Sequence, residues 1–376
     1  MKVLSIAPFV SSYPFSPSGG GKGKFAYTLN RWLAVNKGCE VTVVPWKEPF
    51  GGSQRLGVGD GASVAIEGVG DYIQGSVART LLKRGLTSRK RLINRLKEIL
   101  ERTKPDIIHS HYLYSDFPEL LLETGCTTPS ILTSHSGSPY KDAVRVEQGF
   151  RHSTALVFVS RHDLEFVCTN HLDVRAKSRI IPCPSALGFS GNLPAGGRRE
   201  GIVFVGLLDK NKNLRAVIEA MAYLEKMKLV ICGDGPLAAE ARVWAHRFGD
   251  RVEFLGHQGE QGIRKRLMEA EMLVVPSFRE GFAVAYMEAL CCGTPIIGYP
   301  PNVREHEENL SCEVGRSFDA ATQSPEDLAR LIRELAEGPL MASERRSLIA
   351  ERAQQAYSEE SVFSKYLEMY RELTGL

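Results

Sequence analysis

The sequence predicts an α/β protein made of two doubly wound domains, each built on a mainly parallel sheet. Its 376 residues exceed the roughly 100–200 residues of one domain. Apolar runs of strand length alternate with segments of helix length along the whole chain, as in repeated strand–helix–strand units. A Gly- and Pro-rich stretch, Gly191–Gly197, interrupts this alternation and indicates an interdomain linker.

The first half of the chain begins with an apolar strand and continues the alternation to about residue 181. The expected strands are Val3–Ala7, Glu40–Val44, Asp106–His109, Ser130–Thr133, Ala155–Ser160 and Arg179–Ile181. The expected helices are Phe25–Val35, Arg89–Thr103 and Arg161–Thr169. Pro49–Gly75 is Gly-rich and poorly periodic, so we expect either a mobile loop or an extended surface connection there.

A second alternating series starts directly after the linker. Its expected strands are Gly201–Val205, Lys228–Cys232, Arg251–Leu255, Met272–Val275 and Pro295–Gly298. Its expected helices are Asn213–Leu224, Leu237–Phe248, Gln261–Glu269, Val284–Leu290, Pro325–Glu337 and Glu344–Leu373. We therefore expect Rossmann-like domains at residues 1–190 and 191–355, with a final helix of about residues 356–376 packing back on the first. Ligands of such sheets bind beyond the carboxyl ends of the strands, so the expected site is the cleft between the domains.

The composition argues against a membrane-spanning chain and against a scaffold of disulfides or zinc. No window holds 18 consecutive apolar residues. The eight cysteines are scattered and none forms Cys-x-x-Cys, so we expect reduced thiols in the cytoplasm. Met1–Pro8 predicts a buried strand rather than a signal peptide, because its apolar run is short and no small-residue cleavage site follows.

The net charge of +3 is unevenly distributed. Arg79–Lys104 contains ten basic residues, opposed by Glu98 and Glu101 alone. One interpretation is a solvated helix face. The other is a surface that attracts an anion, such as lipid phosphate, nucleic acid or an acidic acceptor. No aromatic residue interleaves these charges, which argues against single-stranded nucleic acid.

The segment Pro276–Leu290 carries the strongest chemical signal. It follows an apolar strand, and Gly281 allows close approach of the backbone to a ligand just before a helix begins. The unpaired N–H groups of a first helical turn suit phosphate oxygens. Glu288, about one turn into the helix, could accept hydrogen bonds from ribose hydroxyls, and Glu280 from sugar hydroxyls. The alternative is that Glu280 caps the helix and Glu288 is an exposed helix residue.

Several motifs in this order resemble the family 4 retaining glycosyltransferases. Glu280 and Glu288 are separated by seven intervening residues within Pro-Ser-x-x-Glu-Gly-Phe and Glu-Ala-Leu-Cys-Cys-Gly-Thr-Pro, which resemble the family signature. Further matches are Gly19-Gly20-Gly21, Asp106–His111, Thr133–Gly137, Phe204-Val205-Gly206 with Lys212-Asn213, and Cys232–Pro236. The resemblance covers nearly the whole chain and implies the GT-B architecture, with an acceptor-side first domain and a second domain that binds a nucleotide sugar.

The resemblance implies transfer of a hexosyl or related group from a nucleoside-diphosphate sugar to a hydroxyl acceptor, with retention and without a metal ion. A UDP-sugar is the favoured donor, and a GDP-sugar is the alternative. His111, Glu280 and Lys212 are the expected catalytic residues, and His109 and His135 are acceptor-side candidates. The expected donor-binding residues are Gly20, Gly21, Gly206, Lys210, Lys212, Gly281, Phe282, Ala283 and Glu288. For His111 the alternative is a packing role.

The sequence also departs from the family pattern. Leu207 stands where the family usually has an Arg that pairs with the diphosphate, and Lys210 is the candidate to supply the missing charge. Since Arg binds phosphate with two parallel hydrogen bonds and Lys acts as a point charge, donor affinity or choice is expected to differ. Gly298-Tyr299-Pro300-Pro301 and Pro182-Cys183-Pro184 also replace family motifs.

Two other functions remain open from the sequence: a sugar-nucleotide epimerase on the same fold, and a non-catalytic sugar-nucleotide-binding homologue. A dehydrogenase is disfavoured because no Gly-x-Gly-x-x-Gly follows the first strand. The expected location is the cytoplasm, with peripheral membrane contact through Arg79–Lys104 as a hypothesis. The oligomeric state and the acceptor stay open.

Overall fold

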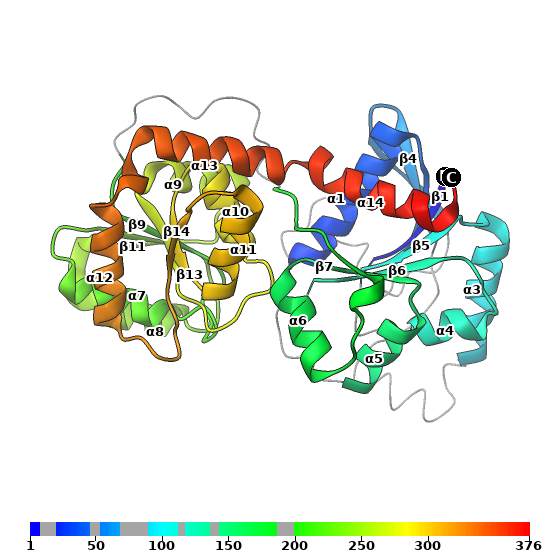
Figure 1. The fold of residues 1–376 in the computed structure, drawn as a ribbon, viewed down its shortest axis with the longest axis horizontal. Coiled ribbons are helices and arrows are strands. Elements are labelled where there is room, and N and C mark those ends of the chain that lie inside the picture. Colours follow the sequence, from blue (N-terminus) through cyan, green and yellow to red (C-terminus); the bar gives the residue numbers. More distant parts are fainter. Residues whose placement is uncertain (8–19, 46–52, 68–88, 112–116, 136–142, 186–198) are drawn as a thin grey trace. The chain divides into compact units, whose positions relative to one another are not determined.

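The chain forms two compact units in a computed structural model, which describes residues 1–7, 20–45, 53–67, 89–111, 117–135, 143–185 and 199–376. The first unit comprises Met1–Pro182 and Val362–Leu376, and the second comprises Cys183–Ser361 (Figure 1). The expected linker, Gly191–Gly197, lies outside the described residues.

The first unit is built on an eight-stranded sheet in the order β3-β4-β2-β1-β5-β6-β7-β8. All described pairings are parallel except that of β3 with β4. The strands are β1 (Lys2–Ala7), β2 (Glu40–Pro45), β3 (Ser53–Gly59), β4 (Ala62–Glu67), β5 (Ile107–Ser110), β6 (Ser130–Ser134), β7 (Ala155–Phe158) and β8 (Ser178–Ile180). The helices are α1 (Gly20–Lys37), α3 (Arg89–Thr103), α4 (Phe117–Glu123), α5 (Ala143–His152), α6 (Arg161–Asn170) and α14 (Glu359–Thr374).

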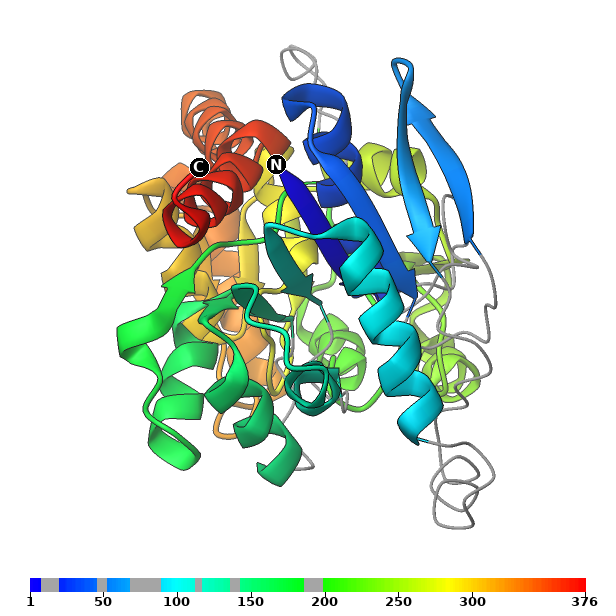
Figure 2. The same cartoon turned by 90° about the vertical axis from the view of Figure 1, so that its right-hand side faces the viewer.

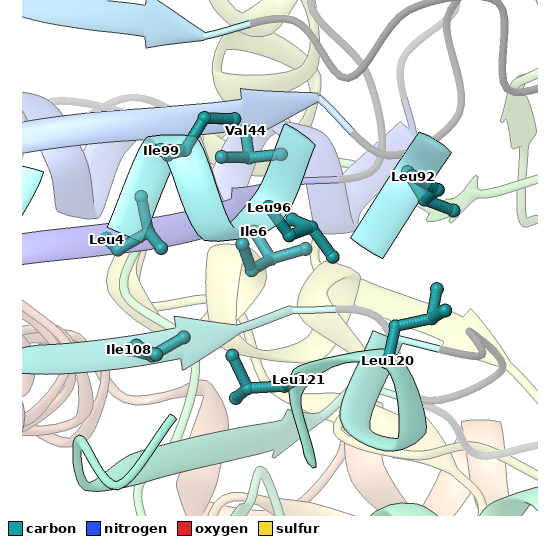
Figure 3. Close-up of a cluster of buried hydrophobic side chains, with 9 residues drawn as sticks. All are labelled: Leu4, Ile6, Val44, Leu92, Leu96, Ile99, Ile108, Leu120 and Leu121. Atoms are coloured by element: carbon teal, nitrogen blue, oxygen red, sulfur yellow. The ribbon is translucent and has the colours of Figure 1, made fainter. Parts of the chain in front are cut away.

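The two faces of this sheet carry different side chains, as β5 shows. Successive side chains of a strand point to opposite faces. Ile108 joins a cluster of aliphatic side chains from the strands and from α3 and α4, which Figure 3 shows in close-up. His109, the next residue, contacts Tyr366 and Tyr370 of α14 instead. In Figure 2, α3 (cyan) and α14 (red) accordingly lie on either side of the strands. The cluster comprises Leu4, Ile6, Val44, Leu92, Leu96, Ile99, Ile108, Leu120 and Leu121.

The prediction of an irregular Pro49–Gly75 is wrong for its central part, which forms the antiparallel hairpin β3–β4. Asp60 and Gly61 make the turn with φ of 50° and 74°. An Asp-Gly pair favours a hairpin turn because both central residues need positive φ. That signal was present in the sequence, but the glycines around it obscured the strand periodicity.

The second unit is a parallel six-stranded sheet in the order β11-β10-β9-β12-β13-β14. The chain winds outward from β9 on one side and from β12 on the other, so the topological switch point lies between these two neighbouring strands. The strands are β9 (Ile202–Val205), β10 (Leu229–Cys232), β11 (Val252–Gly256), β12 (Met272–Val275), β13 (Ile296–Gly298) and β14 (Gly315–Ser317). The helices are α7 (Leu214–Ala220), α8 (Ala238–Ala245), α9 (Glu260–Glu269), α10 (Val284–Cys291), α11 (Pro300–Leu310), α12 (Pro325–Ala336) and α13 (Ser343–Ala356).

The α/β class and the Rossmann-like build of each unit are confirmed. The stretch predicted to be helical, Glu344–Leu373, forms two helices, because Tyr357 and Ser358 separate α13 from α14. In the second half, strand β14 and helix α11 were missed, although Pro300 and Pro301 open α11. Proline suits the first helical turn, where its missing N–H costs no hydrogen bond. Among the described residues, none of the helices combines the length and hydropathy needed to span a bilayer.

Candidate functional site

Two loops of the second unit meet at the switch point between β9 and β12. We call Gly206–Asn213 the α7 loop and Pro276–Ala283 the α10 loop, after the helices that they precede. Asn211 ties them together twice. Its backbone carbonyl accepts the Phe278 N–H at 2.9 Å, and its Nδ2 donates to the Arg279 carbonyl at 2.9 Å.

Lys212 and Glu280 form an ion pair across these two loops. Lys212 Nζ lies 2.5 Å from Glu280 Oε1, and the side chains are only 21% and 11% exposed. Ser277 Oγ donates to the same carboxylate oxygen at 2.5 Å. Both residues were predicted from the sequence, but as separate contacts to phosphate and sugar. Their pairing, and the part played by Ser277 and Asn211, depend on contacts between distant segments.

Glycines after β10 allow the α7 loop to pack closely against that strand end. Gly206 donates its N–H to the Cys232 carbonyl at 3.1 Å. A Cβ on Gly233 would lie 1.9 Å from the Gly206 carbonyl oxygen, and one on Gly235 would lie 2.7 Å from the Leu208 backbone. The Gly-x-Gly turn therefore fixes the path of the loop that carries Lys212. In the same loop Leu207 and Lys210 are exposed, Leu207 by 54%.

The start of α10 presents backbone amides that no described group occupies. Ala283 precedes the helix in the left-handed conformation, with φ 52° and ψ 68°. Within the described part of the chain, the N–H groups of Gly281, Phe282 and Ala283 make no hydrogen bond. The Gly281 carbonyl is held by Asn302 Nδ2 at 2.9 Å. Glu288 lies half-buried one turn inside the helix.

Tyr286 fixes α10 against the sheet. Its buried hydroxyl donates to the Val275 carbonyl at the end of β12, at 2.5 Å. The same oxygen accepts the Tyr299 N–H beyond β13, at 2.9 Å. A Cβ on Gly298 would lie 1.9 Å from that hydroxyl, so the close approach requires glycine. No sequence pattern indicated this contact.

In the first unit, three predicted histidines gather where β5 and β6 end. The His109 and His111 ring centroids lie 3.9 Å apart, and those of His111 and His135 lie 5.8 Å apart. His109 is fixed on both nitrogens, by Tyr370 at 2.5 Å and by Thr133 at 2.7 Å. Within the described residues, no group of three or more His, Cys, Asp or Glu side chains is arranged to hold a metal ion.

Burial keeps the inner histidines neutral. Burial lowers the pKa of His111 to about 3, and burial followed by the charges of His111 and His135 lowers the pKa of His109 well below its usual value. Both ring nitrogens of His111 are buried without a hydrogen-bond partner among the described residues. His135 is half-buried and packs edge-on against Phe25, at 4.7 Å between ring centroids.

The remaining predicted residues lie in α1 and α3. Gly20 and Gly21 open α1, whereas Gly19 lies outside the described residues. Helix α3 buries Leu92, Leu96 and Ile99 in the core, so its apolar face is already used. Arg95 and Arg102 pair with Glu67 of β4, an acidic residue outside the basic segment Arg79–Lys104. Lys90 and Lys97 are exposed. Arg79, Lys83 and Arg84 lie outside the described residues.

Each of the two units matches a family model of glycosyltransferases. The model described as Glycosyltransferase Family 4 matches residues 19–185. The model described as Glycosyl transferases group 1 matches residues 191–356, which include both loops of the site. The chain belongs to the family 4 glycosyltransferases.

Curated relatives of this family 4 glycosyltransferase are distant. It is 27% identical over 213 residues to an uncharacterized glycosyltransferase of Methanocaldococcus jannaschii, covering 54% of this chain and 58% of that protein. It is 29% identical over 254 residues to a D-inositol 3-phosphate glycosyltransferase of Corynebacterium glutamicum, covering 56% and 60%. The matched region thus spans about three-fifths of the length of these relatives.

Solved structures resemble the family 4 glycosyltransferase over its whole described fold. Sucrose-phosphate synthase of Thermosynechococcus elongatus superposes with a TM-score of 0.76 at 20% identity, covering 100% of this chain and 99% of that one. Anabaena HepE in complex with UDP and glucose gives 0.71 at 15% identity, covering 98% and 99%. At these identities the likeness establishes the GT-B fold class and no more.

Proposed function

We propose that this protein transfers a sugar from a nucleoside-diphosphate sugar to a hydroxyl acceptor, with retention of anomeric configuration and without a metal ion. The observation that carries the proposal is the switch point of the second unit. There, the unoccupied amides of Gly281–Ala283 stand at a helix start, next to the Lys212–Glu280 pair. Backbone N–H groups at a helix N-terminus are suited to phosphate oxygens.

Stabilising the leaving diphosphate is the main catalytic task. As the bond between the anomeric carbon and the diphosphate oxygen breaks, negative charge grows on the phosphate and positive charge on the sugar. The amides of Gly281–Ala283 and the Lys212 ammonium meet that charge, assisted by Gly20 or Gly21, while Gly206 allows close approach and Lys210 adds a positive charge. The acceptor oxygen then bonds to the anomeric carbon on the face that the diphosphate leaves, and its proton passes to the departing phosphate.

The Lys212–Glu280 pair orients the phosphate and the sugar of the donor for this step. An ammonium has three N–H donors, and Glu280 accepts from Lys212 and Ser277 through one oxygen, Oε1. Lys212 therefore retains donors for a phosphate oxygen, and Glu280 retains Oε2 for a sugar hydroxyl. Glu288 accepts hydrogen bonds from the ribose.

On the acceptor side, His111 and its neighbours act as neutral groups. A ring with a pKa of about 3 is a neutral imidazole at neutral pH, so it lacks the second proton that an imidazolium would donate as an acid. His111 therefore serves as a hydrogen-bond partner of a sugar or acceptor hydroxyl, supported by His109 and His135. This assignment agrees with the diphosphate, rather than a side chain, taking the acceptor proton.

The donor is proposed to be a UDP-sugar, with GDP-sugars as the alternative. HepE, of similar fold, was solved with UDP and glucose. A thermal-shift screen against UDP-, GDP- and ADP-sugars identifies the base, since a ligand that binds only the folded state raises Tm.

Glu288→Ala tests the ribose contact. It should weaken UDP binding in calorimetry by about tenfold or more, as expected for a lost charge-assisted hydrogen bond. Unchanged affinity would refute the role of Glu288. Product formation only when a hydroxyl acceptor is added separates the transferase from an epimerase and from a non-catalytic homologue.

The acceptor is proposed to be anionic, presented to a cytoplasmic enzyme that meets a membrane surface peripherally. The exposed Lys90 and Lys97 on α3 supply the charge, and the corynebacterial relative is named for an inositol phosphate. Because the apolar face of α3 is buried, this contact would be electrostatic and sensitive to salt. Lys90→Glu with Lys97→Glu should release the protein from phosphatidylserine vesicles, and binding that salt leaves unchanged would count against the surface.

A further inference from the structure

Three aromatic rings form a buried layer beneath the α10 loop. The Phe282 ring lies 5.0 Å from that of His306 and 5.7 Å from that of Tyr357, measured between centroids. His306 and Tyr357 are themselves 5.6 Å apart. Phe282 is 4% exposed and Tyr357 and His306 are 0% exposed. The end of the α10 loop, where its unoccupied amides lie, therefore packs on residues of α11 and of the α13–α14 junction.

Hydrogen bonds link His306 and Tyr357 within this layer. The Tyr357 hydroxyl lies 2.8 Å from His306 Nδ1, and Asn309 Nδ2 donates to the same hydroxyl at 3.4 Å. The Tyr357 hydroxyl therefore joins two residues of α11 to the α13–α14 junction.

Two buried polar atoms beside the α10 loop lack a hydrogen bond within the described residues: His306 Nε2 and Asn302 Oδ1. Burial lowers the pKa of His306 to about 4, and the Phe282 backbone opposes this, so that backbone lies near the ring. A buried polar atom without a hydrogen-bond partner is destabilising, so the packing beneath Phe282 should be sensitive to a change at His306.

Tyr357 also stands where the chain passes between the two units. The chain leaves the first unit after Pro182 and returns to it at Val362. Ser185, just after the first passage, donates its N–H to the Tyr357 carbonyl at 2.8 Å. Tyr357 is thus bonded through its backbone to the outgoing segment and through its hydroxyl to the residue beneath the α10 loop.

We propose that Tyr357 and His306 are positioning residues, which set the place of the α10 loop and couple it to the segments where the chain passes between its units. This inference rests on the proposed function, in that the loop amides bind the donor diphosphate. Neither residue touches the substrate.

The test compares Tyr357→Phe and His306→Gln with Tyr370→Phe in the full chain. Tyr370→Phe is the matched control, because it removes an equally buried tyrosine–histidine hydrogen bond, to His109 in the first unit. Hydrogen exchange reports the Tyr286 amide, which donates to the Ala283 carbonyl at the end of the loop at 2.8 Å, and calorimetry reports UDP affinity. Urea unfolding of each variant corrects the exchange rates for global stability.

We expect the Tyr357 and His306 variants to exchange the Tyr286 amide faster and to bind UDP about fivefold to tenfold more weakly, the order of one lost hydrogen bond. Tyr370→Phe should leave both quantities at wild-type values. The inference is overturned if Tyr357→Phe matches wild type, or if Tyr370→Phe is equally impaired. Should the wild type bind no nucleotide, the proposed function fails, and the exchange rates still decide whether Tyr357 positions the loop.

Discussion

At the scale of single residues, Lys212 has two tasks, and replacing it with alanine removes both. It neutralises Glu280 at 2.5 Å, and in the proposed mechanism it meets the charge growing on the diphosphate. Removing an electrostatic donor of this kind typically slows turnover by about 10²-fold or more. The loss should appear in kcat, because the charge on the leaving phosphate is greatest in the transition state.

Steady-state kinetics of Lys212→Ala measures this effect, with Lys226→Ala, an exposed lysine of the same unit, as the matched control. We expect the Lys226 variant to retain wild-type turnover. If Lys212→Ala also turns over at nearly the wild-type rate, Lys210 or another group stabilises the phosphate and our assignment is wrong.

The sequence located these residues better than it described their surroundings. Glu280, Glu288 and Lys212 stood out because their spacing and neighbours follow a family pattern. Ser277 and Asn302 did not, because their roles arise from a carboxylate and a carbonyl that folding brings to them. His306 had no motif at all, so only its burial against Phe282 reveals its position beneath the loop.

At the scale of elements, α10 depends on a contact between a tyrosine and a glycine. Gly298→Ala would place a methyl group 1.9 Å from the Tyr286 hydroxyl, which holds the ends of β12 and β13. Overpacking of this kind should lower the free energy of unfolding by about 2 kcal/mol or more. Urea denaturation followed by circular dichroism measures the change.

Gly57→Ala is the matched control for that substitution. Gly57 is also a strand glycine, in β3, and an added Cβ there would meet nothing within 4 Å. Its effect should stay within about 0.5 kcal/mol. Equal stability of the two variants would show that the Tyr286 side chain can move away from the added methyl group at little cost and does not fix α10.

The sequence predicted elements best where a single pattern dominates. The strands β1, β2 and β12 are short apolar runs with little else to compete, and each was placed within about a residue of its observed limits. Helix α11 and the β3–β4 hairpin were missed because prolines and glycines, which usually end elements, begin or turn them here. The break at Tyr357 and Ser358 lies inside a continuous amphipathic pattern, and Ser358 Oγ accepts the Ser361 N–H at 3.1 Å where α14 begins.

At the scale of the whole molecule, buried histidines in both units make stability depend on pH. Burial lowers the pKa of His111 to about 3 and that of His306 to about 4. Below about pH 6.5, the usual histidine value, the unfolded chain binds protons that the folded one does not. The free energy of unfolding should therefore fall as the pH drops from 6.5 toward 4, by about 1.4 kcal/mol per pH unit for each such histidine.

Urea unfolding of wild type and His306→Gln between pH 7 and pH 5 checks this dependence. The variant lacks one titrating group, so its stability should fall less steeply with decreasing pH, even if it is less stable throughout. Parallel curves would mean that His306 is protonated in the folded protein, against the burial described above.

The proposed function requires a nucleoside diphosphate to bind where α10 begins. A crystal structure of the protein with UDP tests this most directly. We expect the phosphate oxygens within hydrogen-bond distance of the Gly281–Ala283 amides, with the ribose hydroxyls on Glu288. A diphosphate bound elsewhere, or Glu280 and Glu288 both turned away from it, would contradict the proposed function.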